Sequence, residues 1–355
     1  MRVLISGWSG STNLGDELIF AGLLRLLDGQ QVAAVSVEPE ATRARFDVPA
    51  VAPRQVDRLM RAIRAADLLV FGGGGLLQDE TSPFNLPYHL ARPGLAFALG
   101  TPVVGVGLGA GPLERPGSRR LVAQLSRAVA VSVRDEPSRQ LLEECGVAAR
   151  TGADLALALD PPEGAPEDVI TVSLRPWGGG GGWLPVGARR RHELDPDLLD
   201  ALAAGLDELS ADTGWPVRFV ALQADRDDAV HAAVASRMRA PTERRCPGVH
   251  DVVEEVAAGQ VVVAMRYHAG IAAVLGARPA VLLGYSPKVD ALATALGPGA
   301  ALLPLRPHPI RALATRAANL LREEPGLTAA RTRLRDRVAT DRDVLRVGLD
   351  AVSRP

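Results

Sequence analysis

The chain has 355 residues, of which 47% are hydrophobic and 23% are charged, and its formal net charge is −1. This length exceeds one ordinary core and fits two domains of roughly 150–180 residues. The near-zero charge argues against a general nucleic-acid binder, because such proteins need a large positive field.

Short apolar runs alternate with helical patterns along the chain, which is typical of parallel α/β units. In the first half we expect strands at residues 3–6, 32–37, 68–71, 103–106 and 131–133, and helices at 16–27, 56–65, 118–127 and 135–145. A Pro- and acid-rich linker at 161–168 is then expected to separate a domain at 1–160 from a domain at 169–325.

The second half repeats this rhythm. We expect strands at 169–174, 217–222, 261–265 and 280–283, and helices at 197–209, 227–237, 252–258, 269–275 and 289–296. Helices near 309–323 and 328–349 end the chain, and residues 326–355 are assigned to a C-terminal helix. The predicted fold is α/β, with two Rossmann-like domains facing each other across a cleft.

Open parallel sheets bind ligands beyond the carboxyl ends of their strands. After the first strand, a glycine-rich segment with Asn13, Asp16 and Glu17 opens the first helix. Its glycines let the backbone approach a ligand, and helix-start amides carry partial positive charge. The two acids fit a hydroxyl-rich ligand better than a phosphate, although a well-capped first turn explains them equally well.

Glycines 72–75 follow the third strand and predict a functional loop, since a turn requires fewer glycines. Asp79 could then accept hydrogen bonds from a sugar or cap a helix. Residues 105–110 loosely match a dinucleotide fingerprint, but prolines replace the expected helix, which makes an NAD site a poor interpretation. A Walker A loop is excluded because the only lysine, Lys288, does not follow glycines.

Cations gather at the strand ends of the second half. Arg175 ends a strand before a five-glycine run at 178–182, which suggests an anion clamp with a mobile flap or a disordered insertion. Arg266 and His268 lie two apart and would point the same way in an extended segment. Lys288 follows one strand later, so adjacent parallel strands would bring it beside His268. Taken singly, His268 could be structural and Lys288 a chance survivor, but together these cations predict a multiply anionic ligand.

These segments together resemble the polysaccharide pyruvyl transferase family, in particular its CsaB-type members. The resemblance rests on five motifs, which run from the first loop to Lys288: Gly15-Asp16-Glu17, glycines 72–75 with Leu76-Leu77-Gln78-Asp79, Ser132-Val133-Arg134-Asp135, residues 173–177, and Arg266-Tyr267-His268-Ala269-Gly270.

The resemblance implies a GT-B-like fold that moves a pyruvyl group from phosphoenolpyruvate onto a sugar, giving a pyruvate ketal and phosphate. It implies that His268 and Lys288 are catalytic and that Arg175, Arg266 and Arg134 bind phosphoenolpyruvate. The first domain would hold the acceptor through Asn13, Asp16, Gly74 and Asp79. CsaB-type members act on a lipid-linked amino-sugar such as β-ManNAc, and the ketal anchors surface-layer proteins.

The chemistry of the residues fits this expectation independently. Bidentate arginines suit the carboxylate and phosphate of phosphoenolpyruvate. We expect His268 to move protons at the hydroxyl or the phosphate, and Lys288 to bind phosphate or act as the acid. No metal and no cofactor are expected, since no HExxH motif or Cys/His cluster is present. A nucleotide-sugar glycosyltransferase and a non-catalytic glycan-binding protein stay open as alternatives.

We expect a cytoplasmic protein, because no signal peptide and no apolar run of about 18 residues is found. Cys145 and Cys246 lack CxxC spacing, so neither a disulfide scaffold nor a zinc site is expected. The resemblance to enzymes with lipid-linked acceptors also suggests peripheral contact with the inner face of the membrane. The arginines at 189–191 are a candidate contact with an anionic bilayer, or an ordinary solvated loop.

Overall fold

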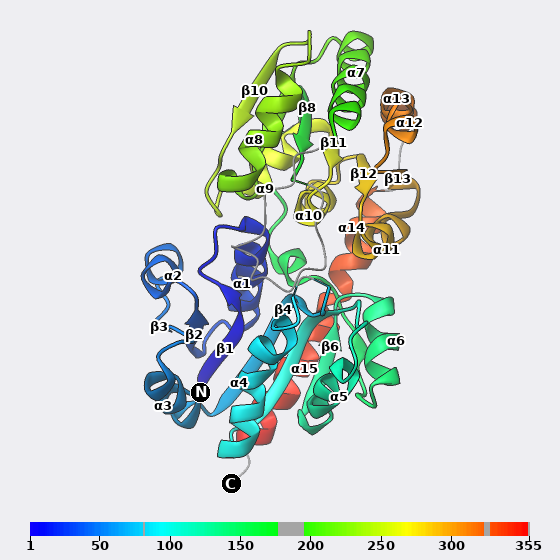
Figure 1. Cartoon of the computed structure of the whole chain (residues 1–355). Helices are drawn as coiled ribbons and strands as arrows, with labels where there is room; N and C mark the ends of the chain where they lie inside the picture. Colours follow the sequence, from blue (N-terminus) through cyan, green and yellow to red (C-terminus); the bar gives the residue numbers. More distant parts are fainter. Residues whose placement is uncertain (81, 177–194, 323–326, 354–355) are drawn as a thin grey trace.

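The computed structural model describes residues 1–80, 82–176, 195–322 and 327–353. Its strands form two separate sheets, shown in Figure 1. The strand orders are β3-β2-β1-β4-β5-β6-β7 and β10-β9-β8-β11-β12-β13, and the first strand of each half lies inside its sheet where the order reverses. This is the doubly wound arrangement of Rossmann-like domains. The predicted α/β fold with two such domains is therefore confirmed.

The first sheet contains near-continuous apolar strands, as expected for parallel strands buried on both faces. Its strands are β1 (Arg2–Ser9), β2 (Gln31–Ser36), β3 (Ala50–Val51), β4 (Leu68–Leu77), β5 (Val103–Ala110), β6 (Ala130–Val133) and β7 (Arg150–Thr151). The helices around it are α1 (Leu14–Leu26), α2 (Pro39–Phe46), α3 (Val56–Ala65), α4 (Asn85–Leu99), α5 (Ser118–Ala123) and α6 (Glu136–Glu144), with 3₁₀ turns η1 (Gln124–Arg127) and η2 (Leu155–Ala158).

The glycine clusters of the first domain lie inside strands, so the prediction that glycines 72–75 form a loop is wrong. Strand β4 continues through them to Leu77, and its register with β5 shifts between Gly74 and Leu77. Gly73 and Gly74 have φ angles of 76° and 84°, which favour glycine, and this irregular backbone still pairs as a strand. Residues 105–110 likewise belong to β5, which agrees with rejecting a dinucleotide loop there.

The second sheet is built in the same way. Its strands are β8 (Glu167–Ser173), β9 (Val217–Val220), β10 (Thr242–Arg245), β11 (Gly259–Ala264), β12 (Ala280–Gly284) and β13 (Ala300–Pro304). The helices are α7 (Pro196–Thr213), α8 (Ala224–Ala235), α9 (Val252–Ala257), α10 (Tyr267–Leu275), α11 (Pro287–Leu296), α12 (Pro307–Ile310) and α13 (Leu313–Arg322), with the 3₁₀ turn η4 (Gly297–Gly299).

The chain ends with two helices rather than the single helix predicted at 328–349. Helix α14 (Leu327–Asp336) packs on the second domain, and α15 (Val338–Ser353) crosses back to the first sheet, where Val344 joins the core. Figure 1 shows α15 in red behind that sheet. Gly348 permits this close packing, because a Cβ there would lie 2.5 Å from Val104 Cγ1. No helix in the described ranges is long and apolar enough to cross a membrane.

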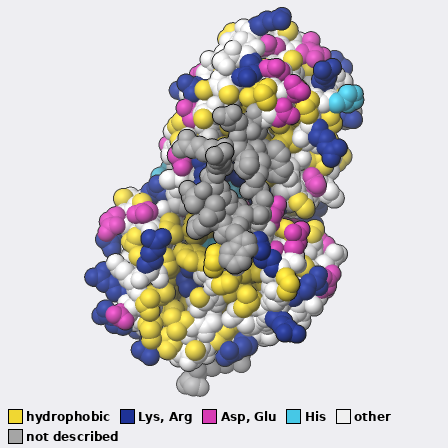
Figure 2. All heavy atoms as spheres, in the orientation of Figure 1, with side chains coloured by type: hydrophobic (Ala, Val, Ile, Leu, Met, Phe, Trp, Pro, Cys, Tyr) yellow, Lys and Arg dark blue, Asp and Glu magenta, His cyan; other side chains and the backbone are white. Residues whose placement is uncertain are grey.

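The carboxyl ends of the two sheets face each other. Leu14 N, after β1, donates to Leu222 O, after β9, at 2.8 Å, and Gln223 Nε2 donates to Thr12 Oγ1 at 3.1 Å. Leu18 of the first domain also shares a core cluster with Ile271 of the second. On the face shown in Figure 2, basic and acidic side chains are interspersed over both domains, in line with the near-neutral charge.

Candidate active site

Three neighbouring strands of the second sheet deliver the predicted cations. Strands β8, β11 and β12 are hydrogen-bonded neighbours, and their carboxyl ends lead into Arg175, His268 and Lys288 respectively. The predicted adjacency of the strands that carry His268 and Lys288 is therefore confirmed.

Tyr285 connects Arg175 to Lys288. Arg175 Nη1 donates to Tyr285 Oη at 3.2 Å, and Lys288 Nζ lies 5.7 Å from the centre of the same ring. Burial alone would raise the pKa of Tyr285, but the charges of Lys288 and Arg175 outweigh it and lower the pKa to about 8. Burial, with the nearby Arg134 and Arg175, lowers the pKa of Lys288. Tyr285 had no predicted role, because a single tyrosine in a turn carries no motif.

Two polar groups in this corner have no hydrogen-bond partner within the described ranges. They are Arg175 Nε and Ser286 Oγ, and both atoms are buried. Ser286 occupies the N-cap of α11 but its side chain does not cap the helix. An unpaired buried polar group costs about 1–3 kcal/mol, and a helix start favours negative charge. The corner formed by Arg175, Ser286 and Lys288 is therefore suited to a phosphate or carboxylate group.

Arg266 is largely engaged in the fold. Its Nε donates to Asp227 Oδ2 at 2.9 Å, and its Nη2 donates to Gln223 Oε1 at 3.1 Å and also pairs with Asp227. Because α10 begins at Tyr267, the prediction that Arg266 and His268 point the same way from an extended segment is wrong. Among the described residues, Nη1 is the guanidinium nitrogen of Arg266 that makes no hydrogen bond, so it is the one left to contact a ligand.

His268 faces the first domain instead. Its Nε2 lies 3.5 Å from Asp154 Oδ2, and its side chain is only 12% exposed. The first turn of α1 packs against the other ring nitrogen, since a Cβ on Gly15 would lie 2.2 Å from His268 Nδ1. Asp154 was missed in the sequence analysis, because nothing in its local sequence links it to a histidine of the other domain.

Arg134 reaches the same boundary from the end of β6. Its Nε donates to Asp135 Oδ2 at 3.1 Å, and its Nη1 lies 4.0 Å from Asp154 Oδ2. Its guanidinium carbon lies 4.8 Å from the centre of the Tyr267 ring. The structure thus brings Arg134 to the predicted site, where two carboxylates balance its charge.

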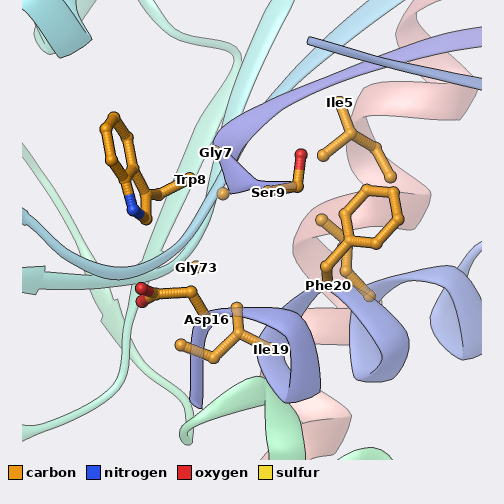
Figure 3. Close-up of a pocket in the computed structure, with 10 residues that line it drawn as sticks. Ile5, Gly7, Trp8, Ser9, Asp16, Ile19, Phe20 and Gly73 are labelled. Atoms are coloured by element: carbon orange, nitrogen blue, oxygen red, sulfur yellow. The ribbon is translucent and has the colours of Figure 1, made fainter. Parts of the chain in front are cut away.

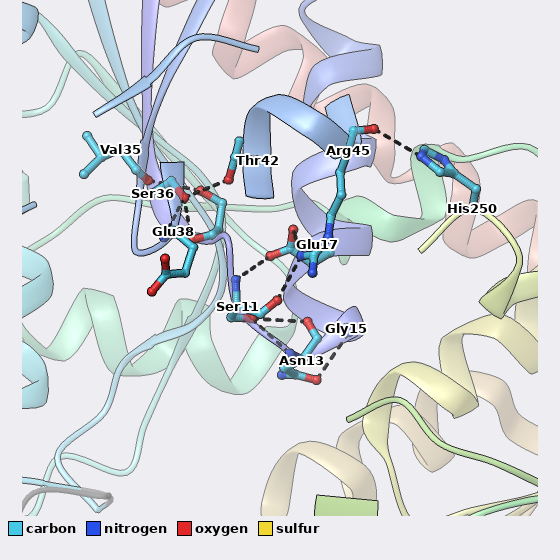
Figure 4. Close-up of polar contacts among 11 residues, drawn as sticks. Ser11, Asn13, Gly15, Glu17, Val35, Ser36, Glu38, Thr42, Arg45 and His250 are labelled. Atoms are coloured by element: carbon cyan, nitrogen blue, oxygen red, sulfur yellow. Dashed lines mark hydrogen bonds and ion pairs between the residues drawn. The ribbon is translucent and has the colours of Figure 1, made fainter. Parts of the chain in front are cut away.

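The loop between β1 and α1 is held by its own side chains. Asn13 caps α1 by accepting from Gly15 N at 3.3 Å, and its Nδ2 donates to Asp16 Oδ2 at 2.7 Å. Glu17 accepts from Ser11 N and from Arg45 Nη1, as Figure 4 shows, so Glu17 is structural. Asp16 is half-buried, and burial raises its pKa despite the opposing charge of His268.

A small pocket opens beside Asp16. Figure 3 shows the Asp16 carboxylate pointing toward the side of this pocket on which Trp8 lies. Gly73 lines the pocket, and Gly74 lies next to Asp16, since a Cβ on Gly74 would be 3.8 Å from Asp16 Oδ1. The predicted acceptor residues Asn13, Asp16 and Gly74 are therefore close together.

Asp79 does not belong to this group. It is 2% exposed, and its carboxylate accepts from Glu114 N, Arg115 N and Ser118 Oγ at 2.7–2.9 Å. These bonds hold the turn before α5. We assign Asp79 this structural role in place of the predicted sugar contact.

Two predicted features, the glycine run at 178–182 and the arginines at 189–191, lie outside the described residues. Within the described parts of the chain, no group of three or more His, Cys, Asp or Glu side chains is arranged to hold a metal ion.

Comparison with solved structures shows extensive similarity at low identity. UDP-GlcNAc 2-epimerase from Neisseria meningitidis matches with a TM-score of 0.61 and 11% identity, over 98% of this chain and 99% of that chain. Anabaena Alr3699/HepE, solved with UDP and glucose, matches with a TM-score of 0.54 and 13% identity, over 99% and 98%. These similarities show a shared fold and confirm the GT-B-like prediction.

Comparison of sequences identifies the family. No curated protein matches this chain significantly. The sequence model described as "Polysaccharide pyruvyl transferase" matches residues 13–287, which include Asp16, Arg134, Arg175 and His268. Since this match spans well over half of the chain, the protein belongs to the polysaccharide pyruvyl transferase family.

Proposed function

We propose that this protein moves a pyruvyl group from phosphoenolpyruvate onto a sugar of a cell-wall or surface polysaccharide precursor, as CsaB-type members do. The products would be a pyruvate ketal and phosphate. The observation that carries the proposal is the corner formed by Arg175, Ser286 and Lys288, where buried polar groups lack partners among the described residues. Family membership supports the reaction class.

The donor would place its phosphate in this corner. Lys288 and Arg175 supply positive charge, and the start of α11 supplies backbone amides. Arg134 and Nη1 of Arg266 remain for the carboxylate, although carboxylates of the protein already balance most of their charge. Growing negative charge on the leaving phosphate would be stabilised where Lys288 and Arg175 lie.

Ketal formation requires two hydroxyl groups of the sugar. The first adds to C2 of phosphoenolpyruvate while C3 gains a proton, phosphate then leaves, and the second hydroxyl adds to C2. One hydroxyl proton thus ends on the methyl carbon and the other on phosphate, so charge balances. We propose that Asp16 and His268, which meet where the two domains face each other, accept hydroxyl protons and that Lys288 or Tyr285, in the donor corner, donates a proton.

The acceptor would bind on the first domain. Trp8 is 36% exposed, and its ring lines the pocket that contains Asp16. An aromatic face packs well on the C–H face of a sugar, while Asn13 and Asp16 can bind its hydroxyls. We propose an amino-sugar such as β-ManNAc, carried on a lipid at the cytoplasmic face of the membrane.

The test is phosphate release from phosphoenolpyruvate by the purified protein with a panel of amino-sugar and galactose acceptors. We expect release only when donor and acceptor are both present, and a large loss in His268→Ala. If a nucleotide-sugar but not phosphoenolpyruvate raises the melting temperature, the protein is a glycosyltransferase instead. Acceptor binding without turnover, unaffected by His268→Ala, would indicate a glycan-binding protein.

A further inference from the structure

We infer that Asp154 of the first domain is the positioning residue of His268 in the second domain. Its Oδ2 receives the hydrogen on His268 Nε2 when the domains close on substrate. The inference deepens the proposed function and rests on it, because it assigns each nitrogen of the proposed catalytic histidine a separate task.

The geometry consists of two polar atoms that lack partners. Asp154 is 3% exposed, and its Oδ1 caps η2 by accepting from Ala156 N at 3.1 Å. Its Oδ2 has no hydrogen-bond partner in the described ranges, and neither does His268 Nε2, although both atoms are buried. These two atoms lie 3.5 Å apart.

A small movement would satisfy both atoms. Hydrogen bonds of this type span about 2.7–3.2 Å, so the pair is only a few tenths of an ångström too far apart. Catalytic hydrogen bonds are often long in free enzymes and shorten in the substrate complex. Since Asp154 and His268 belong to different domains, domain closure is the movement that would shorten this distance.

Asp154 is held rigidly for this task. Asp341, on α15, accepts from Ala153 N at 2.9 Å and from Ser132 Oγ at 2.5 Å. The backbone just before Asp154 is therefore fixed to the first sheet by the last helix of the chain. Arg134 Nη1, 4.0 Å from Asp154 Oδ2, keeps this oxygen in an electropositive setting.

Binding of Nε2 by Asp154 determines the role of the other nitrogen. With its hydrogen on Nε2, the neutral imidazole keeps the lone pair on Nδ1, which faces Gly15 and the start of α1. Two carboxylates interact with the ring, those of Asp154 at the start of η2 and of Asp16 on α1. The positive charge of Arg134 also acts on Asp154, and the charges of Lys288 and Arg266 act on Asp16. Tyr267 packs edge-on against the ring. Nδ1 would thus accept the hydroxyl proton, while Asp154 stabilises the imidazolium.

The decisive variant is Asp154→Asn. It keeps Oδ1 as the cap of η2 but replaces Oδ2 with an amide that cannot accept from Nε2–H. We expect kcat for phosphate release to fall on the order of 10²-fold, with KM for phosphoenolpyruvate unchanged. In a His268→Ala background, Asp154→Asn should not lower kcat any further.

The matched control is Asp207→Asn. Asp207 also accepts from backbone amides, those of Arg239 and Ala240 at 2.9–3.0 Å, but it lies on α7, away from the site. This variant should keep wild-type kcat. If Asp154→Asn keeps kcat within about threefold, or slows the His268→Ala variant as much as the wild type, the inference is wrong.

A second readout needs no substrate. A double-mutant cycle on melting temperature combines Asp154→Asn with His268→Gln, and we expect the double variant to lose less than the sum of the single losses. Coupling in this cycle without any phosphate release by the wild type would overturn the proposed function but keep the Asp154–His268 pair. Additive losses together with normal turnover by Asp154→Asn would overturn the pair alone.

Discussion

Gly15→Ala tests how closely the two domains meet at His268. Gly15 lies in the first turn of α1 at a backbone conformation open to all residues, so alanine brings no backbone strain. Alanine would even favour the helix by about 1 kcal/mol. The obstacle is the imidazole, because the new Cβ would lie 2.2 Å from Nδ1 and 2.7 Å from Cγ of His268.

The size of the effect follows from these distances. Ordinary contact begins at 3.4 Å, so the ring has to retreat by about 1.2 Å or turn away from α1. A displacement of about 1 Å in a catalytic group can cost 10²-fold in rate, and overpacking costs about 1–3 kcal/mol. We therefore expect kcat for phosphate release to fall about 10²-fold and the melting temperature to drop.

The comparison that isolates the contact uses a His268→Ala background. There the added methyl group finds space, and Gly15→Ala should raise the melting temperature through its helix propensity. Gly248→Ala is the control, since its Cβ would meet only Asp251 Oδ2, at 3.4 Å. Wild-type kcat and melting temperature in the single Gly15→Ala variant would refute this account of the domain contact.

Three further predictions concern single side chains. Lys288→Arg should lower kcat at least about 10-fold, because a planar, permanently charged guanidinium cannot replace a compact ammonium group that can lose its proton beside Tyr285. Full activity of this variant would show that positive charge alone suffices. Burial raises the pKa of Asp341 from 3.8 to about 7, so the folded state binds the extra proton and stability falls as pH rises through this window, by about 4 kcal/mol in total. The free energy of unfolding, measured by chemical denaturation, should fall across this pH window in the wild type but not in Asp341→Asn. The same pH dependence in both proteins would contradict the prediction. Asp79→Asn should lower the free energy of unfolding by about 1–3 kcal/mol without changing KM for the acceptor, and a selective rise in that KM would restore Asp79 to the acceptor site.

The alternation of apolar runs and helical patterns predicted most of the central strands, because parallel strands buried on both faces carry that signal in their own sequence. The elements that were not predicted lack such a signal in their own sequence. Strand β10 is Thr-Glu-Arg-Arg at the edge of its sheet, and α4 contains Pro93, which local rules treat as a helix breaker. The glycines of β4 suggested a loop, since local propensity does not show that neighbouring strands still pair with them.

The residues of the candidate site also fall into those that could be predicted from the sequence and those that could not. His268 and Lys288 follow two strands that are consecutive along the chain, so strand order alone brought these two residues together in the prediction, whereas the sheet order of the structure places the strand before Arg175 beside them. Asp154 and Tyr285 needed the structure. Asp154 meets His268 only because two domains face each other, and Tyr285 gains its lowered pKa only from cations placed around it in space.

The central claim is that phosphoenolpyruvate donates its pyruvyl carbons to a sugar. The most direct measurement is 13C NMR of the product formed from phosphoenolpyruvate labelled at C2, with phosphate measured in the same sample. The proposal predicts that the label appears in a carbon bonded to two sugar oxygens, in equal amount to the phosphate released, and that Lys288→Arg and His268→Ala suppress both signals. Label that remains in phosphoenolpyruvate or free pyruvate with every acceptor tested would contradict it.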